Sequence, residues 1–264
     1  MSALQIYVDG IGLLGPGLTG WAHGCEVLTG RAALNLAPTQ LPPAAALPPA
    51  ERRRVGVTIK LSMATGFEAA HNAGADPAQL ATVFSSSEGD CDNYHAILET
   101  LASDDRAVSP TRFHNSVHNA PSGYWSIATT CMESSTSLCA YDATFAAGLL
   151  EAATQAIFSG KRCLLMAYDT AYPEPLCTLR PIPHAMGIAM VLNPVKTPAA
   201  RARLTLNLST SAATTMPETD MEALRTRIPA ARSLPLMQLL AKETAGSVVI
   251  EYLDTLNLAI DVHL

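Results

Sequence analysis

The chain has 264 residues, 48% of them hydrophobic and 15% charged, with a formal net charge of −6 at pH 7. This length allows a substantial core in one large domain or two small ones, and the acidic balance argues against a nucleic-acid partner. The charged fraction is well under the roughly 25% of typical soluble domains, so we predict either an alanine-rich core or a large subunit interface.

No segment reaches the about 18 to 20 apolar residues that a membrane helix needs, and the start of the chain lacks the pattern of a signal peptide. The cysteines form no CxxC motif or ligand-like pairing, which indicates core thiols in a reducing compartment. We therefore expect a cytoplasmic protein with no membrane span, no metal and no organic cofactor. The cysteines are Cys25, Cys91, Cys131, Cys139, Cys163 and Cys177.

The first third of the chain alternates between strand and helix patterns, which predicts a layered α/β architecture. Residues 4–8 alternate as a strand before a glycine and proline turn, and residues 20–28 form a short helix pattern. Five prolines predict an extended connection over residues 36–49. Apolar spacing then predicts a helix over residues 59–72 and a buried strand over residues 79–85.

The middle of the chain is less regular. A helix is predicted over residues 92–101, with Asp90 or Asp92 as its N-cap. Residues 122–130 and 134–140 fit neither period clearly.

A long apolar pattern then predicts a helix over residues 145–158, and a strand follows at residues 163–167. Beyond Pro194 the pattern weakens, and we expect strands there to close the edge of the sheet. The elements predicted in this part are a strand, two short helices and two strands, at residues 203–210, 221–227, 234–241, 247–252 and 256–262.

The most specific pattern lies between Ser109 and Asp169. It begins with an Asn-x-x-x-Gly segment at Asn119, continues through a strand-like run to Cys139, and ends with a helix before Gly160. This order resembles the N-terminal half of a β-ketoacyl synthase, which has the same segment followed by a strand, a reactive cysteine, a helix and a glycine.

Other pieces match that family in order and at similar spacing. They are Gly10-Ile11-Gly12, Leu28-Thr29-Gly30, the arginine-rich turn at residues 51–54, the strand and loop at 83–90, Arg180-Pro181 and the strand at 186–192. The resemblance implies a thiolase-like α/β/α fold. Residues 1–194 would form the ketosynthase-like half, and residues 195–264 a short extension that completes the same domain.

Two departures limit what the resemblance implies about activity. In the family the reactive cysteine lies seventeen residues before the helix-ending glycine, and counting back from Gly160 leads to Ala143. An alanine methyl group cannot attack a thioester. None of the seven histidines resembles the family's catalytic histidine motifs, because the half that carries them is expected to be largely absent.

Three neighbouring features offer alternative chemistry. Cys139 lies four residues before the expected nucleophile, a displacement of more than about 10 Å along a strand, so we expect a buried structural thiol. Asp142 is expected to cap the helix that starts near Thr144. His114 and His118 would share one face of a helix, but no third metal ligand lies nearby.

The resemblance also implies an interface. In the family the segment after Ser109 crosses a dimer interface and closes the far end of the partner's acyl tunnel. The alternative is ordinary interface or core packing. The residues expected at that tunnel or interface are Arg112, Phe113, Ser116, Val117 and Asn119.

We therefore predict a pseudo-ketosynthase: a non-catalytic, chain-length-factor-like subunit that forms a heterodimer with a catalytic ketosynthase. It would shape the partner's tunnel in aryl polyene or other polyketide biosynthesis, and an acyl carrier protein would deliver substrate directly or through the partner. Two alternatives stay open, namely an acyltransferase or condensing enzyme that uses Cys139 and a homodimeric acyl-binding scaffold. Product length and the identity of the partner do not follow from the sequence.

Overall fold

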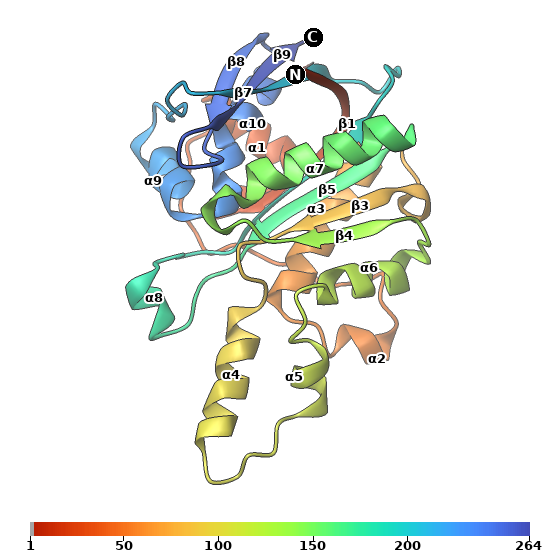
Figure 1. Ribbon diagram of the computed structural model, residues 1–264. Coiled ribbons are helices and arrows are strands. Elements are labelled where there is room, and N and C mark those ends of the chain that lie inside the picture. Colours follow the sequence, from red (N-terminus) through yellow and green to blue (C-terminus); the bar gives the residue numbers. More distant parts are fainter. Residues whose placement is uncertain (1–2) are drawn as a thin grey trace.

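A nine-stranded mixed sheet runs through the part of the chain that the structure, a computed structural model, describes: residues 3–264 (Figure 1). Its order is β4-β3-β5-β6-β1-β7-β9-β8, and the short β2 pairs with β1. The strands are β1 (Leu4–Gly15), β2 (Leu18–Thr19), β3 (Ala81–Ser85), β4 (Ser135–Leu138), β5 (Cys163–Asp169), β6 (Met186–Asn193), β7 (Ala202–Ser209), β8 (Gly246–Ile250) and β9 (Asn257–His263).

Helices connect these strands and cover the sheet. They are α1 (Trp21–Leu28), α2 (Pro49–Arg52), α3 (Val57–Asn72), α4 (Cys91–Ala102), α5 (Pro110–His114), α6 (Ala120–Thr129), α7 (Thr144–Ser159), α8 (Leu176–Leu179), α9 (Thr219–Arg227) and α10 (Leu234–Ala241). Three single 3-10 turns accompany them, at Pro77–Gln79, Tyr141–Ala143 and Pro229–Ser233. None of the helices in residues 3–264 is long and apolar enough to cross a membrane.

The sheet has two kinds of strand pairing. β3 pairs in parallel with both β4 and β5, and every residue of β3 and β5 is buried. Strands buried on both faces are typical of parallel sheets covered by helices on each side. From β5 onward each neighbour in the sheet is antiparallel, through β6, β1, β7, β9 and β8.

Apolar side chains pack on both faces of the part of the sheet that is formed by strands β3, β5, β6 and β1. On one face α3 and α6 pack against the strands through a core that includes Ile59, Trp125 and Met166. On the other face α7, α1 and α10 pack through a second core that includes Phe145 and Leu236. This arrangement confirms the layered α/β/α architecture (Figure 1).

The strands after residue 194 are covered on one face only. In β7, Leu204 and Leu206 point into the core shared with α10, whereas Arg203 and Thr205 on the opposite face are half-buried. β9 alternates in the same way. The fold therefore has three layers, helix, sheet and helix, in the region of α3. At the β8 end it has two layers, because helices cover only one face of the sheet there. The division of the chain at residue 194 stays a prediction, because β7 pairs directly with β1.

The first strand is longer than predicted. β1 continues past the expected turn to Gly15, and Gly10 and Gly12 lie inside it. A Cβ atom at Gly10 would collide with the carbonyl oxygen of Ala69 in α3, and one at Gly12 with that of Thr65. The glycines thus allow α3 to pack directly on the strand backbone, and their role is close packing and not turn formation.

The two segments that fitted neither period become α6 and β4, and α5 and α8 were not predicted. The other predicted helices and strands are present with ends shifted by a few residues, as is usual for element boundaries. Asp90 is the N-cap of α4, where its side chain accepts a hydrogen bond from Asn93 N at 3.1 Å.

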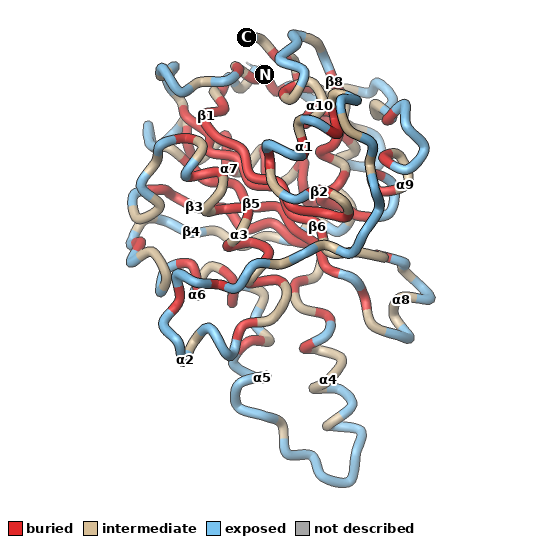
Figure 2. The backbone as a smooth tube through the Cα atoms, turned by 180° about the vertical axis from the view of Figure 1, so that it is seen from behind, coloured by how far each residue is buried: buried red, intermediate tan, exposed pale blue. Residues whose placement is uncertain are grey.

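The helices α4 and α5 project from the sheet as an arm whose tip, residues 103–109, is exposed almost throughout (Figure 2).

Candidate functional site

The position expected for a nucleophile lies where helix α7 begins. Ala143 closes the 3-10 turn at Tyr141–Ala143 and is the N-cap residue of α7, without a side-chain capping hydrogen bond. The helix ends at Gly160, whose φ of 68° is the left-handed conformation that favours glycine. The seventeen-residue spacing therefore corresponds to one complete helix, and the side chain at its start is a methyl group.

An arginine occupies the polar space beside this turn. Arg180 donates to Glu88 Oε1 at 2.8 Å, to Asp142 Oδ1 at 2.6 Å and to the Tyr172 hydroxyl at 3.0 Å. Its guanidinium carbon lies 3.8 Å from the centroid of the Tyr141 ring. The Arg180 side chain is only 15% exposed. A planar guanidinium can donate hydrogen bonds to two carboxylates while its face stacks on an aromatic ring. The NH1 and NH2 groups of Arg180 therefore bind side chains of this protein.

Asp142 joins this cluster to the C-terminal part of the chain. Its second oxygen, Oδ2, accepts a hydrogen bond from Arg232 at 3.1 Å. The prediction that Asp142 caps α7 is wrong, because two arginines bind the carboxylate instead. We call Glu88, Asp142, Tyr172, Arg180 and Arg232 the arginine cluster.

A buried carboxylate lies behind the arginine cluster at the end of β5. Asp169 Oδ1 accepts a hydrogen bond from Ser87 N at 2.9 Å, and Oδ2 accepts one from Ala230 N at 2.7 Å. Burial raises the pKa of this carboxyl, although the two backbone donors oppose the shift. Asp169 thereby ties the loop after β3 to the 3-10 turn at Pro229–Ser233, far apart in sequence.

Cys139 lies four residues before Ala143, outside the start of α7. It follows the edge strand β4 and is exposed, so the prediction of a buried thiol is wrong. Cys139 is exposed because β4 is the last strand at this edge of the sheet and pairs only with β3. The thiol donates to the Ser87 carbonyl oxygen at 2.6 Å.

The neighbouring buried thiol is unsuited to nucleophilic chemistry. Burial and the adjacent Glu88 carboxylate raise the pKa of Cys91 to about 12. Cys91 therefore stays protonated at neutral pH.

The two closely spaced histidines do not form a metal site. Helix α5 ends at His114, so His118 does not share a helix face with it. His114 packs edge-on against Tyr124 with ring centroids 6.4 Å apart, and a ring nitrogen of His118 lies 3.3 Å from the Ser86 carbonyl oxygen. Within residues 3–264 no three potential metal ligands gather at one point.

Three of the five residues predicted at a tunnel or interface lie together. Phe113, Val117 and Asn119 line an open apolar depression of about 650 Å³ between α5 and α6. Phe113 is 70% exposed, and Val117 is 53% exposed. We call this hollow the α5–α6 depression. Its walls are completed by Pro110, His114, Ala120, Gly123, Tyr124 and Ile127.

The other two predicted residues lie elsewhere. Arg112 lines a separate, charged depression together with Arg53, Arg54, Asp90 and Asp92. The Ser116 hydroxyl donates to the Phe113 carbonyl oxygen at 2.8 Å and so closes the end of α5. The tunnel role of all five residues stays a prediction.

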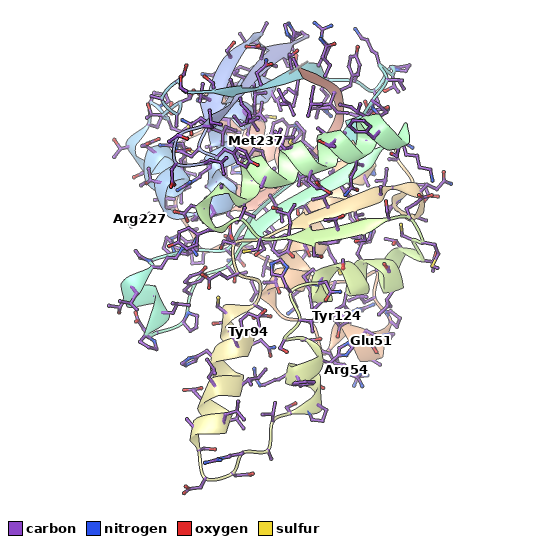
Figure 3. The ribbon with its side chains drawn as sticks, in the orientation of Figure 1. Glu51, Arg54, Tyr94, Tyr124, Arg227 and Met237 are labelled. Atoms are coloured by element: carbon purple, nitrogen blue, oxygen red, sulfur yellow. The ribbon has the colours of Figure 1, made fainter. Side chains whose placement is uncertain are left out.

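Buried amides that the sequence did not reveal hold this segment in place. Asn93 Nδ2 donates to the Arg112 carbonyl oxygen at 2.8 Å, which fixes α5 against α4. Asn115 Nδ2 donates to the Arg54 carbonyl oxygen at 2.8 Å, and its Oδ1 accepts from the Tyr124 hydroxyl at 3.0 Å. Figure 3 shows Tyr124 and Arg54 near one another beside α5. These partners lie up to 61 residues apart, so no local pattern marks them.

An open strand edge adjoins the α5–α6 depression. β4 pairs with β3 on one side only, and α6 packs beside it. Its sequence, Ser-Thr-Ser-Leu, carries no charge or proline that would protect an exposed edge. Met132 and Ile127 add exposed apolar surface nearby. An uncovered edge strand beside apolar side chains is typical of a surface that pairs with another chain.

Comparisons with known proteins bear on this site. The model of the β-ketoacyl synthase N-terminal domain family matches residues 29–252. No curated protein matches the sequence significantly.

Solved structures with the same fold were found at low sequence identity. A chain in the complex of the ketosynthase ApeO with its chain length factor ApeC, from Xenorhabdus doucetiae, has a TM-score of 0.74 and 19% identity; the match covers 98% of this chain and 99% of that one. A chain of AntDE:AntF, a type II polyketide synthase acyl carrier protein in complex with its ketosynthase, has a TM-score of 0.76, 10% identity and coverage of 98% and 99%.

A ketosynthase of the bacillaene polyketide synthase from Bacillus amyloliquefaciens gives a different coverage. Its TM-score is 0.57 at 11% identity, and the match covers 85% of this chain but 49% of that one. The fold described above is thus about equal in extent to the first two matched chains and to about half of this ketosynthase.

Proposed function

The chain belongs to the β-ketoacyl synthase N-terminal domain family, and we propose that within it the chain is a non-catalytic, chain-length-factor-like subunit. It pairs with a catalytic ketosynthase and contributes a wall of that enzyme's acyl tunnel in aryl polyene or other polyketide biosynthesis. An acyl carrier protein brings the substrate to the pair, directly or through the partner.

The observation that carries the proposal is the chemistry at the start of α7. A decarboxylative condensation needs a thiolate and donors that stabilise the enolate and the oxyanion. Here Ala143 supplies neither, and the neighbouring Arg180 has its donors directed to Glu88, Asp142 and Tyr172. The arrangement supports a site that keeps the family's backbone while its polar groups stabilise the fold.

The surface formed by α5, α6 and β4 supports the proposal that the partner is a chain of the same fold. The α5–α6 depression has apolar walls but is open to solvent, and β4 beside it has an unpaired edge. A second ketosynthase-like chain that pairs with β4 would cover both features. Obligate pairs of this kind commonly bury more than about 2,000 Å², which would account for a charged fraction of only 15%.

The exposed side chains of the depression support the proposed tunnel role. Phe113 projects from α5 while Asn93 and Asn115 fix the backbone around it. A large side chain on a fixed backbone at a shared interface acts as a stop for a growing acyl chain. Control of chain length in this account is therefore geometric, and no bond is made or broken by this chain.

The test is reconstitution of a candidate ketosynthase from the same organism, with its acyl carrier protein, in the presence and absence of this chain. We expect products of defined length only when both chains are present. Products of the same length and amount from the ketosynthase alone would refute the proposal.

The two alternatives are distinguished by the same reaction. A condensing enzyme that uses Cys139 would form product without the partner ketosynthase, and a homodimeric scaffold would leave the partner's product unchanged. The exposure of Cys139 favours testing the first, although its thiol donates to the Ser87 carbonyl oxygen.

A further inference from the structure

A row of polar side chains crosses the uncovered face of the sheet near the two chain ends. The strand register aligns Tyr7 of β1 with Arg203 of β7, and Arg203 with His263 of β9. All three side chains lie on the face that carries no helix, opposite to the buried Leu204 and Val262. In Figure 1 these strands lie at the far end of the molecule from α4 and α5.

The loop between β6 and β7 turns this row into a pocket. Lys196 and Ala200 of that loop form a further wall, and the hollow has a volume of about 150 Å³. Lys196 and Arg203 are basic side chains, and Tyr7 and His263 add a hydroxyl and an imidazole, whose Nε2 lies 3.4 Å from Thr205 Oγ1. No acidic side chain is among the lining residues, which are Tyr7, Lys196, Ala200, Ala202, Arg203, His263 and Leu264.

Arg203 lacks the partners that an arginine at this depth normally has. Its Nε atom is buried and forms no hydrogen bond with any of the residues that the structure describes. Neither Arg203 nor Lys196 takes part in any ion pair within the described residues 3–264. A buried donor without an acceptor is unfavourable, so the absence of a partner indicates a ligand that supplies one.

The nearest acidic residues along these strands are already engaged. Asp9, two residues after Tyr7, accepts hydrogen bonds from Asn193 Nδ2 at 2.8 Å and from Thr197 Oγ1 at 3.1 Å. Asp261, two residues before His263, accepts a hydrogen bond from the Ser247 hydroxyl. Neither carboxylate lines the pocket, and neither forms an ion pair with Arg203 or Lys196 within residues 3–264.

We propose that this pocket binds a small tetrahedral oxyanion, either inorganic phosphate or the phosphate of a monoester. The fork of an arginine and the point charge of a lysine are suited to phosphate oxygens. A hollow of about 150 Å³ is large enough for a phosphate group. The site is independent of the proposed subunit role, since it lies away from both the arginine cluster and the α5–α6 depression.

Isothermal titration calorimetry with inorganic phosphate tests the proposal on the intact chain. We expect saturable one-to-one binding, weakened at least tenfold by R203Q and by K196Q. R203K, which keeps the charge but loses the fork, is expected to weaken binding about threefold to fivefold. The matched control is R201Q, because Arg201 is exposed and carries the same charge two residues away without lining the pocket; it should change the affinity less than twofold.

A parallel titration with glycerol 3-phosphate identifies the source of the phosphate. Tighter binding than inorganic phosphate would assign the site to monoesters, and weaker binding would assign it to the free ion. The proposal is overturned if phosphate does not saturate the wild-type protein, or if R201Q weakens binding as much as R203Q does. Thermal denaturation without phosphate verifies that each variant is folded.

Discussion

Arg180 and Asp142 form an ion pair of 2.6 Å immediately before Ala143, at the helix start where the family's enzymes carry a nucleophile. Because Arg232 binds the other oxygen of Asp142, the pair also connects this turn to the C-terminal part of the chain. The site thus combines an alanine at the start of α7 with a set of charges that hold four segments together. Its residues contribute to stability, and the predictions below separate that role from the proposed role in the tunnel.

Removal of the arginine should destabilise the fold more than removal of a surface arginine. R180M leaves Glu88 and Asp142 without their shared partner, so we expect the free energy of unfolding to fall by about 2 kcal/mol. The matched control is R31M, since Arg31 pairs with Glu26 through side chains 60% and 49% exposed; it should cost less than about 0.5 kcal/mol. Urea denaturation measures both, and equal losses would contradict the central place given to Arg180.

The volume of the side chains in the α5–α6 depression should set product length. F113A removes the proposed stop, and we expect the reconstituted pair to make longer products. G123L should have the opposite effect, because a Cβ at Gly123 meets no atom within 4 Å and a larger side chain would extend into the depression. The control is F158A, since Phe158 is 82% exposed at the end of α7 and does not line the depression.

Mass spectrometry of the released acyl chains gives the readout for these three variants. A product distribution that F113A and G123L leave unchanged, or that F158A shifts as strongly as F113A, would exclude the depression from the tunnel.

The Cys139 thiol should be dispensable for product formation. Cys139 follows β4 and donates to the Ser87 carbonyl oxygen, whereas the residue at the start of α7 is Ala143. We expect C139A to retain product formation within twofold of the wild-type pair, measured as initial rate. A loss of tenfold or more, with the heterodimer intact by size-exclusion chromatography, would point to an enzyme that uses Cys139.

Stability should depend on pH through the buried carboxyl of Asp169. Burial raises its pKa in the folded protein above the ordinary value near 3.8, so the folded state binds this proton more tightly than the unfolded state does. The stabilisation linked to this proton is complete below about pH 3.8 and is lost as the pH rises through the folded-state pKa. Each unit of the shift is worth about 1.4 kcal/mol.

The variant D169N cannot titrate at this position. We therefore expect the difference in unfolding free energy, wild type minus D169N, to be larger at pH 4 than at pH 7. The exposed Asp254 provides the matched control, and D254N should alter the pH dependence of stability less than D169N does. A wild-type advantage that grows with rising pH would show that the two backbone hydrogen bonds outweigh burial.

Local patterns in the sequence predicted most elements of the fold but not the contacts that shape it. The apolar period of α3 and α7 and the dense prolines before α2 each carry their own signal. The full length of β1 does not, because it depends on α3 packing against Gly10 and Gly12 from far along the chain. The exposure of Cys139 likewise depends on β4 being the last strand of the sheet, and strand order is a long-range property.

The sequence likewise predicted one part of the site and missed another. The position of Ala143 followed from family spacing, and the structure puts it at the start of α7. The partners of Asp142 did not follow, since Arg180 and Arg232 lie 38 and 90 residues away. Helix capping is the ordinary local role of an aspartate at that point, and the ion pairs replace it only in the folded chain.

The most direct measurement is co-expression of this chain with a candidate ketosynthase from the same organism, with the tag on the ketosynthase alone. Size-exclusion chromatography with mass determination then follows. The account predicts a one-to-one complex that withstands purification and that forms product only when both chains are present. Separate elution of the two chains, with this one as a folded monomer or homodimer and the ketosynthase fully active alone, would contradict it.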